Sequence, residues 1–96
     1  MVKVIWSEQA IDDLTNIANY NSRFSENYSS SLVNKLFKKP NILKTMPKIG
    51  RVVPEKKDDS IRELIEGNYR LICQISSEER VDILTVHHSS TPLINL

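Results

Sequence analysis

The segment Pro47-Lys-Ile-Gly-Arg-Val-Val-Pro-Glu55, followed by Ile61-Arg-Glu-Leu-Ile-Glu-Gly-Asn-Tyr-Arg-Leu71, decides how this chain folds. Two prolines and a glycine in its first part prevent a helix from running through it, because proline lacks an amide proton and glycine weakens helices. Its second part alternates in strand fashion and pauses at a Gly-Asn dipeptide, which is typical of a hairpin turn. We therefore predict helices before this segment and strands from Ile61 onward.

The length and composition are those of one small domain, with 96 residues, an apolar content of 40% and a formal net charge of +1. A chain of this length can bury one modest core. The near-neutral charge gives no general sign of a nucleic-acid-binding protein, but cations concentrate in the middle of the chain. They could face phosphate, although a solvated helix face is the commoner explanation. These cations are Lys35, Lys38, Lys39, Lys44, Lys48, Arg51, Lys56 and Lys57.

Cys73 is the only cysteine, which excludes an internal disulfide and a cysteine-based metal site. It lies in a strongly apolar stretch, where we expect a buried thiol rather than a nucleophile. The His87-His88 pair has no third ligand at a suitable spacing, so we predict no metal and no other cofactor. No apolar run has the length of a membrane-spanning helix, and no signal peptide is recognisable. The sequence thus predicts a soluble, cytoplasmic protein without a membrane partner.

A first strand over residues 2–6 is expected to lead directly into a helix. Its β-branched residues favour the strand. Ser7 then offers a side-chain oxygen suited to an N-cap, and apolar residues recur at helical spacing until the pattern fades near Asn21. Asp12 and Asp13 fall outside the apolar stripe of this helix, so we expect both carboxylates in solvent.

A second helix is expected to begin after Ser25, which is another suitable N-cap. Pro40 interrupts its apolar pattern, because a proline inside a helix removes one hydrogen bond and clashes with the preceding turn. We expect either a kink near residues 37–39 or a helix that stops and restarts before Met46. The two helices should form an antiparallel hairpin that covers one face of a sheet.

Three strands are expected over residues 61–65, 69–75 and 80–87, joined by short turns and therefore antiparallel. Alternation places Arg70 on the face opposite to Cys73. Counting back from a turn at residues 77–78 puts Arg70 opposite Thr85, on the same face as His87, with His88 on the other face.

The register of the first hairpin decides which charged side chain shares a face with Arg70. A two-residue turn at Gly67-Asn68 puts Glu63 on that face. A three-residue turn with a bulge shifts the pairing by one residue and puts Arg62 there instead. Because a lone arginine turned toward the helices would bury an unpaired charge, we favour the bulged turn, with Arg62 and Arg70 sharing the open face.

Taken together and in order, these motifs resemble the RelE/ParE superfamily of bacterial type II toxins. The resemblance covers essentially the whole chain and implies an α+β, RelE-like fold over a single toxin domain, residues 1–96. In this fold an N-terminal strand and a two-helix hairpin pack on a mainly antiparallel four-stranded sheet, in the order β-α-α-β-β-β. The superfamily also implies a cognate antitoxin that wraps and blocks the toxin. The motifs are Ile-Trp-Ser-Glu at 5–8, Pro-x-x-Gly-Arg-x-x-Pro-Glu at 47–55, Ile-Arg-Glu-Leu at 61–64, Tyr-Arg-Leu-Ile at 69–72 and Val-His-His at 86–88.

The superfamily has two well-known activities. RelE-like and YoeB-like members cut messenger RNA on the ribosome without a metal, whereas ParE-like members poison DNA gyrase. The opening at residues 5–8 resembles YoeB, while residues 50–55 and 62–64 also resemble the ParE-like branch. We interpret the chain as a toxin that inhibits growth by ribosome-dependent mRNA cleavage. The alternatives are a ParE-like gyrase poison and an attenuated domain that only binds antitoxin.

Metal-independent RNA cleavage needs a base for the 2′-hydroxyl, cations that hold the phosphate and an acid for the leaving oxygen. The YoeB-type pattern maps onto Glu55, Arg70 and either His87 or His88. Glu55 would act as the base, Arg62 and Arg70 as phosphate clamps, and His88 as the acid, with His87 named beside it. Further phosphate contacts are expected from Lys48, Arg51, Lys56 and Lys57.

Some of these residues also have a purely structural interpretation. Glu55 could be a solvated loop carboxylate that pairs with Lys56 or Lys57. Arg62 could pair with Glu63 on the surface, which would contribute less than about 1 kcal/mol. Arg70 is the best single candidate, because the residues that adjoin it are apolar and a charge there needs a purpose.

Two positions depart from the pattern of the superfamily. Thr91 stands where many relatives carry an arginine, so a phosphate-holding guanidinium is missing there. Pro40 interrupts the second helix. Both departures are compatible with natural divergence and with an attenuated or inactive toxin.

Overall fold

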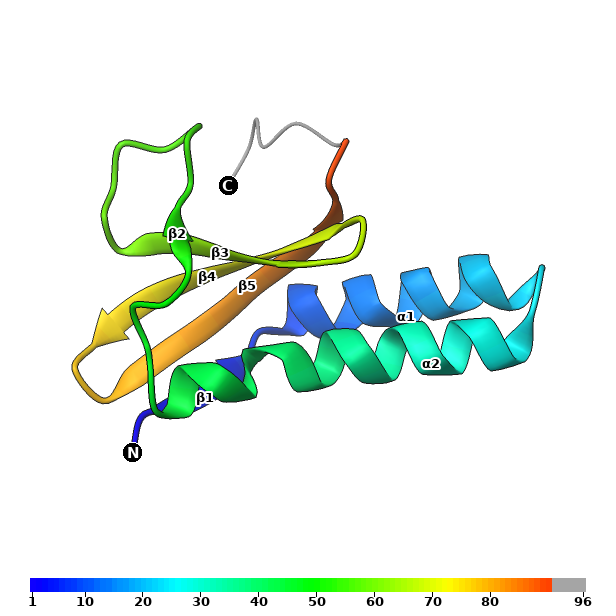
Figure 1. The fold of residues 1–96 in the computed structure, drawn as a ribbon, viewed down its shortest axis with the longest axis horizontal. Helices are drawn as coiled ribbons and strands as arrows, with labels where there is room; N and C mark the ends of the chain where they lie inside the picture. Colours follow the sequence, from blue (N-terminus) through cyan, green and yellow to red (C-terminus); the bar gives the residue numbers. More distant parts are fainter. Residues whose placement is uncertain (91–96) are drawn as a thin grey trace.

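The computed structural model describes residues 1–90, in which a two-helix hairpin covers one face of a five-stranded sheet (Figure 1). The strands lie in the order β1-β5-β4-β3-β2, with β1 parallel to β5 and every other pair antiparallel. The predicted α+β architecture is confirmed, and the two-residue strand β2 adds a fifth strand to it. Thr91 lies outside the described residues. The elements are β1 (Lys3–Trp6), α1 (Glu8–Ser22), α2 (Glu26–Lys38), the 3-10 helix η1 (Lys39–Lys44), β2 (Arg51–Val52), β3 (Ile61–Glu66), β4 (Tyr69–Ser77) and β5 (Arg80–His88).

Both helices begin where the sequence predicts. The Ser7 hydroxyl oxygen accepts the Ala10 amide at 3.0 Å, and the Ser25 hydroxyl oxygen accepts the Tyr28 amide at 3.1 Å. Pro40 lies in the first turn of η1, where its missing amide proton removes no helical hydrogen bond. The second helix therefore stops and restarts at the proline, which is one of the two predicted outcomes.

The main core lies between the helix hairpin and the sheet. Helix side chains Ala10, Leu14 and Leu36 are buried there against the central strands. A smaller apolar cluster lies apart from this core, on the other face of the sheet, where Val53 packs with Ile61 and Ile72. The sheet is thus apolar on both faces near its centre, and polar side chains on the open face lie beside apolar neighbours. The strand residues of the main core are Leu64, Leu71, Cys73, Val81, Ile83 and Val86.

The β3–β4 hairpin turns in two residues, and Gly67 adopts a left-handed conformation with φ of +58°. Ile65 consequently pairs with Arg70, and Glu63 shares the face of Arg70. The predicted bulged turn, which placed Arg62 on that face, was wrong. The unpaired buried charge that the bulge would avoid does not arise, because Arg62 on the helix side is only half-buried and its guanidinium donates to backbone carbonyls. On the open face, Glu63 supplies the counter-charge for Arg70.

The β4–β5 hairpin contains two irregularities that shift its register. The predicted position of Arg70 opposite Thr85 was therefore wrong. Arg70 instead lies opposite His87, and the two residues are direct neighbours on adjacent strands. Alternation along β5 then directs His87 and His88 to opposite faces, as predicted.

Cys73 is fully buried, as predicted, and gives a stability prediction with a defined pH window. Burial raises the pKa of the thiol from 9.0 to about 11. The unfolded chain loses the thiol proton near pH 9, whereas the folded chain keeps it until about pH 11, so raising the pH through this window favours unfolding. At about 1.4 kcal/mol per pKa unit, the thiol should lower the free energy of unfolding by about 2–3 kcal/mol between these values.

Chemical denaturation at a series of pH values measures this loss. The matched control is Cys73→Ala, which lacks the thiol but retains every other titrating group. Its stability should fall less steeply between pH 9 and pH 11. Equal slopes for the two proteins would contradict the prediction.

Candidate functional site

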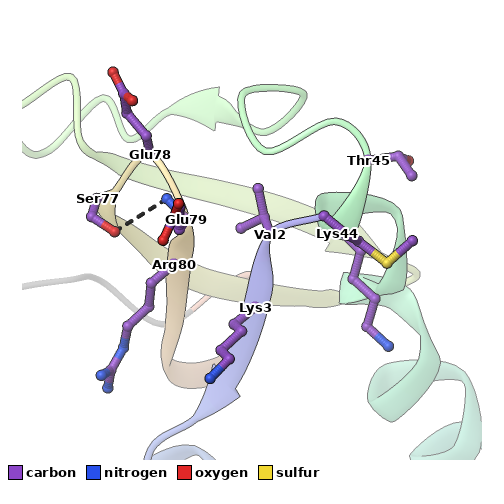
Figure 2. A pocket seen from close by; sticks show the side chains of 9 residues that line it. Val2, Lys3, Lys44, Thr45, Ser77, Glu78, Glu79 and Arg80 are labelled. Atoms are coloured by element: carbon purple, nitrogen blue, oxygen red, sulfur yellow. Dashed lines mark hydrogen bonds between the residues drawn. The ribbon is translucent and has the colours of Figure 1, made fainter.

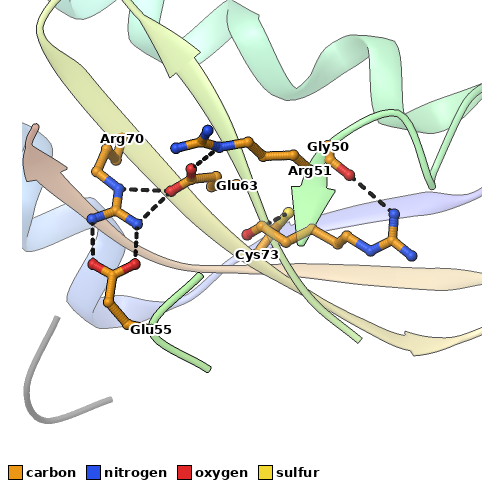
Figure 3. Close-up of polar contacts among 7 residues, drawn as sticks. Gly50, Arg51, Glu55, Glu63, Arg70 and Cys73 are labelled. Carbon is orange, nitrogen blue, oxygen red and sulfur yellow. Dashed lines mark hydrogen bonds and ion pairs between the residues drawn. The ribbon is translucent and has the colours of Figure 1, made fainter. Parts of the chain in front are cut away.

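A network of ion pairs on the open face of the sheet is the candidate functional site (Figure 3). At its centre lies Arg70, whose side chain is only 9% exposed. Glu63 Oε2 accepts a hydrogen bond from Arg70 Nε at 2.6 Å. The two carboxylate oxygens of Glu55 accept from Arg70 Nη1 and Nη2 at 2.8 and 3.0 Å, and Arg51 binds the other oxygen of Glu63. Two carboxylates therefore bind two edges of one guanidinium.

The four side chains of this network form an internally neutral set. Arg51 and Arg70 contribute two positive charges, and Glu55 and Glu63 contribute two negative charges. The Glu63 side chain is fully buried, so it depends on these arginines for its charge to be tolerated. The hydrogen bonds that Arg70 donates to Glu55, and then those to Glu63, raise the pKa of Arg70 above its ordinary value, against the opposing effect of burial. Arg70 is thus permanently charged and held in place.

Local structure accounts for the position of each network residue. The two-residue turn aligns Glu63 with Arg70, and β2 pairs Arg51 directly with Glu63. Gly50, just before β2, packs so tightly that a Cβ atom would come within 2.9 Å of the Glu63 carbonyl oxygen. Glycine therefore allows β2 to approach β3. A turn closed by the Lys56 amide then directs Glu55 back toward Arg70.

Three of the five predicted catalytic residues gather around the network. Glu55 contacts Arg70 directly, and His87 is the cross-strand neighbour of Arg70. The His87 ring is half-buried, with Nε2 at 3.2 Å from the Thr85 hydroxyl oxygen. A carboxylate, a guanidinium and an imidazole therefore lie on one face of the sheet, as the site prediction requires.

Arg62 and His88 lie away from the network. Arg62 shares a face with Cys73, and its guanidinium donates to the carbonyls of Lys48 and Gly50. This position supports a structural role in the loop before β2 and does not support the predicted phosphate clamp. His88 lies on the helix side of the sheet, with its ring edge-on to Tyr69 at 5.5 Å between centroids.

The four cations predicted to contact phosphate occupy three different places. Arg51 belongs to the network and is bound by Glu63. Lys56 and Lys57 directly follow Glu55 in the loop between β2 and β3. Lys48 is exposed on the loop before β2, and its carbonyl accepts a hydrogen bond from Arg62. The pairing partner of Glu55 in the network is Arg70 rather than either neighbouring lysine.

Two carboxylates outside the predicted site residues organise this face. Glu63 binds both arginines of the network, in the register of the two-residue turn that the sequence analysis considered but did not favour. Asp13 of α1, expected in solvent, is half-buried instead. Its Oδ2 accepts the Val86 amide at 2.9 Å and the Thr85 hydroxyl at 2.5 Å, next to His87. Nothing in the local sequence around Asp13 points to these contacts.

A cavity of about 920 Å³ lies outside this site (Figure 2). It lies at the other end of β4, where the start of β1, the end of η1 and the β4–β5 turn meet. Its charged side chains carry both signs and include Lys3, Lys44, Glu78, Glu79 and Arg80. Within residues 1–90, no group of three or more histidine, cysteine or acidic side chains could hold a metal ion, and no helix could span a membrane.

Comparison with known proteins gives the family of the chain. Residues 4–92 match the family described as the ParE toxin of the type II toxin-antitoxin system parDE. The chain belongs to the ParE toxin family. The predicted resemblance to the RelE/ParE superfamily is thereby confirmed, and with it the prediction of a toxin from a type II toxin-antitoxin system. Among curated proteins, none matches this ParE-family toxin significantly.

Two solved structures share the fold of this ParE-family toxin. A chain of the chromosomal ParDE toxin-antitoxin system from P. aeruginosa has a TM-score of 0.77 at 16% identity, covering 92% of this chain and 96% of that one. A chain of the toxin-antitoxin complex RelBE2 from Mycobacterium tuberculosis has a TM-score of 0.56 at 20% identity, covering 91% and 96%. At these identities the likeness establishes the fold alone.

Proposed function

We propose that this ParE-family toxin inhibits growth by binding DNA gyrase, and that a cognate antitoxin blocks it by binding the toxin. The observation that carries the proposal is the internal neutralisation of the candidate site. Arg51 and Arg70 are both bound by carboxylates of the same molecule. Recognition of a protein surface is compatible with such a site, whereas a phosphate would have to compete with these carboxylates for either guanidinium.

The same contacts weigh against RNA cleavage in this arrangement. Both oxygens of Glu55 already accept hydrogen bonds from Arg70, so a ribose 2′-hydroxyl would have to displace one of them. A phosphate would likewise have to displace Glu55 from Arg70. Arg62, the second predicted clamp, donates to backbone carbonyls on the other side of the strand.

Ribosome-dependent mRNA cleavage is the second candidate, and one observation favours it. Glu55, Arg70 and His87 lie together on one face, which is the combination that base, clamp and acid would need. On the ribosome, a phosphate that bound Nη1 and Nη2 of Arg70 would displace Glu55, which could then act as the base. This candidate therefore requires an exchange of ligands at Arg70.

Two assays on the purified toxin distinguish the candidates. We expect the toxin to stop DNA supercoiling by gyrase and to leave messenger RNA on translating ribosomes uncut by primer extension. His87→Gln, which removes the titrating imidazole, should leave the inhibition of gyrase unchanged. The cognate antitoxin, added in an equimolar amount, should restore supercoiling.

Each alternative has its own outcome. Cleavage within codons, lost in His87→Gln and accompanied by normal supercoiling, would replace the gyrase proposal with the nuclease. Tight antitoxin binding without either effect would identify an attenuated toxin domain.

A further inference from the structure

A surface from η1 to β3 combines lysines with exposed aliphatic side chains. Its apolar members are each between 40% and 50% exposed, which is a high value for large aliphatic residues gathered in one place. It is formed by side chains of η1, of the loop before β2 and of the end of β3. The η1–β3 surface, as we call it, consists of Lys39, Ile42, Met46, Lys48, Ile49 and Ile65.

Two hollows on this surface adjoin at Ile49. One, of about 410 Å³, is lined in part by Lys39, Ile42 and Ile65. The other, of about 400 Å³, is lined by Met46, Pro47, Lys48 and Ile49. Ile49 lines both hollows, which we together call the groove. Each hollow has aliphatic side chains and one lysine in its lining.

The chain segment that contains most of this surface carries only positive charges. Between Glu26 and Glu55 the sequence contains no acidic residue and six cations. Two of the six, Lys39 and Lys48, belong to the η1–β3 surface. A partner with acidic side chains therefore complements this surface. The six cations are Lys35, Lys38, Lys39, Lys44, Lys48 and Arg51.

The edge of β3 beside this groove carries backbone groups without a neighbouring strand. β2 pairs only with Arg62 and Glu63, and in the described part of the chain no other strand borders the rest of β3 on that side. The Ile61 carbonyl accepts the Val53 amide on this side, and alternation by two residues directs the backbone groups of Ile65 the same way. Such an edge can pair with an added extended segment.

The groove is held in shape by hydrogen bonds within the toxin. The Met46 amide donates to the Ile42 carbonyl at 2.9 Å, and the Ile49 amide donates to the Met46 carbonyl at 3.1 Å. Arg62 fixes the same loop through the carbonyl of Lys48 at 3.2 Å. A surface already ordered before binding loses less conformational entropy when a partner binds.

We propose that the η1–β3 surface binds an extended protein segment in which apolar and acidic residues alternate. The apolar side chains fill the two hollows, the acidic ones lie near Lys39 and Lys48, and the backbone pairs with Ile65. A nucleic acid fits less well, because the exposed side chains are aliphatic and offer no ring on which a base could stack. This inference does not depend on whether gyrase or messenger RNA is the target.

The test measures binding of three labelled probes to the full-length toxin by fluorescence anisotropy. One is a short peptide in which leucine alternates with glutamate, the second has serine in place of leucine, and the third is an oligonucleotide of equal charge. We expect the leucine-containing peptide to bind about tenfold more tightly than the other two, because only it buries apolar surface in the groove. The Ile65 amide should exchange with solvent more slowly in that complex.

Matched variants locate the binding surface. The double variant Met46→Ser with Ile49→Ser should lose the tenfold preference, whereas Ile11→Ser, at a similarly exposed position on α1, should retain it. Lys39→Glu with Lys48→Glu should weaken both peptides. The proposal is overturned if the oligonucleotide binds as tightly as the leucine-containing peptide, if Ile11→Ser weakens binding as much as the groove variant, or if Ile65 gains no protection.

Discussion

Replacing Arg70 with alanine is expected to lower the free energy of unfolding by about 3–5 kcal/mol. The Glu63 carboxylate is fully buried and is bound by Arg70 on one side and Arg51 on the other. Arg51 is two-thirds exposed and would remain as the single cation beside it. Removing Arg70 therefore leaves a buried charge poorly compensated, which costs far more than the loss of a surface ion pair. Urea denaturation followed by circular dichroism measures the difference.

A matched control and a second substitution isolate this cause. Arg80 pairs with Asp82 through a side chain that is more than half exposed, so Arg80→Ala should cost less than about 1 kcal/mol. Adding Glu63→Gln to Arg70→Ala should recover part of the lost stability, because it removes the uncompensated charge. Similar losses for Arg70→Ala and Arg80→Ala would refute the account of the network.

This stability effect changes how a loss of toxicity must be interpreted. A variant that unfolds also stops inhibiting growth, so Arg70→Ala alone cannot separate a catalytic role from a structural one. His87 is half-buried and lies outside the ion pairs of the network, and its replacement disturbs the fold less. His87→Gln is therefore the more informative substitution for distinguishing the nuclease from the gyrase poison.

The elements of this fold were predictable because their signals are local. Ser7 and Ser25 cap the helices, and Pro40 interrupts the second helix where its ring forbids continuation. The turn residues and the alternating strands after Ile61 are equally local. Each of these features depends on residues within one turn of helix or one hairpin, so the local sequence is sufficient to predict it.

The register of the sheet was less predictable because it depends on contacts between distant residues. A shift of one residue in the β3–β4 hairpin exchanges Arg62 for Glu63 beside Arg70, and the favoured choice rested on avoiding an unpaired charge. The structure meets that requirement differently, because the half-buried Arg62 donates to backbone carbonyls on the helix side. The bulges between β4 and β5 leave no comparable local mark, and they bring His87 beside Arg70.

Asp13 illustrates a second limit of reasoning from periodicity. A helical wheel separates an apolar face from a solvent face, but it does not reveal a sheet edge beside the helix. β1 pairs with β5 only as far as Ile83, so the rest of β5 has no strand on that side within residues 1–90. Ser7 and Asp13 supply the missing hydrogen-bond partners at Leu84 and Val86. At Val86, the Asp13 carboxylate therefore accepts the hydrogen bond that a neighbouring strand would otherwise accept.

Asp13→Ala is expected to lower the free energy of unfolding by about 2–3 kcal/mol. It removes a charged acceptor from the Val86 amide and the Thr85 hydroxyl, and both of these residues are buried. Buried donors that lose their acceptor keep the full cost of desolvation. The Val86 amide should also exchange with solvent faster, because it would no longer be hydrogen-bonded.

The neighbouring Asp12 provides the control, since it is exposed on the same helix and its replacement by alanine should change stability by less than about 0.5 kcal/mol. Asp13→Asn keeps an acceptor oxygen and should recover much of the lost stability, which separates hydrogen bonding from simple truncation. Because Thr85 also lies within 3.2 Å of His87, the alanine variant should alter the environment of that imidazole. Unchanged Val86 exchange in Asp13→Ala would mean that the end of β5 is held by other contacts, and that this helix does not position the histidine beside Arg70.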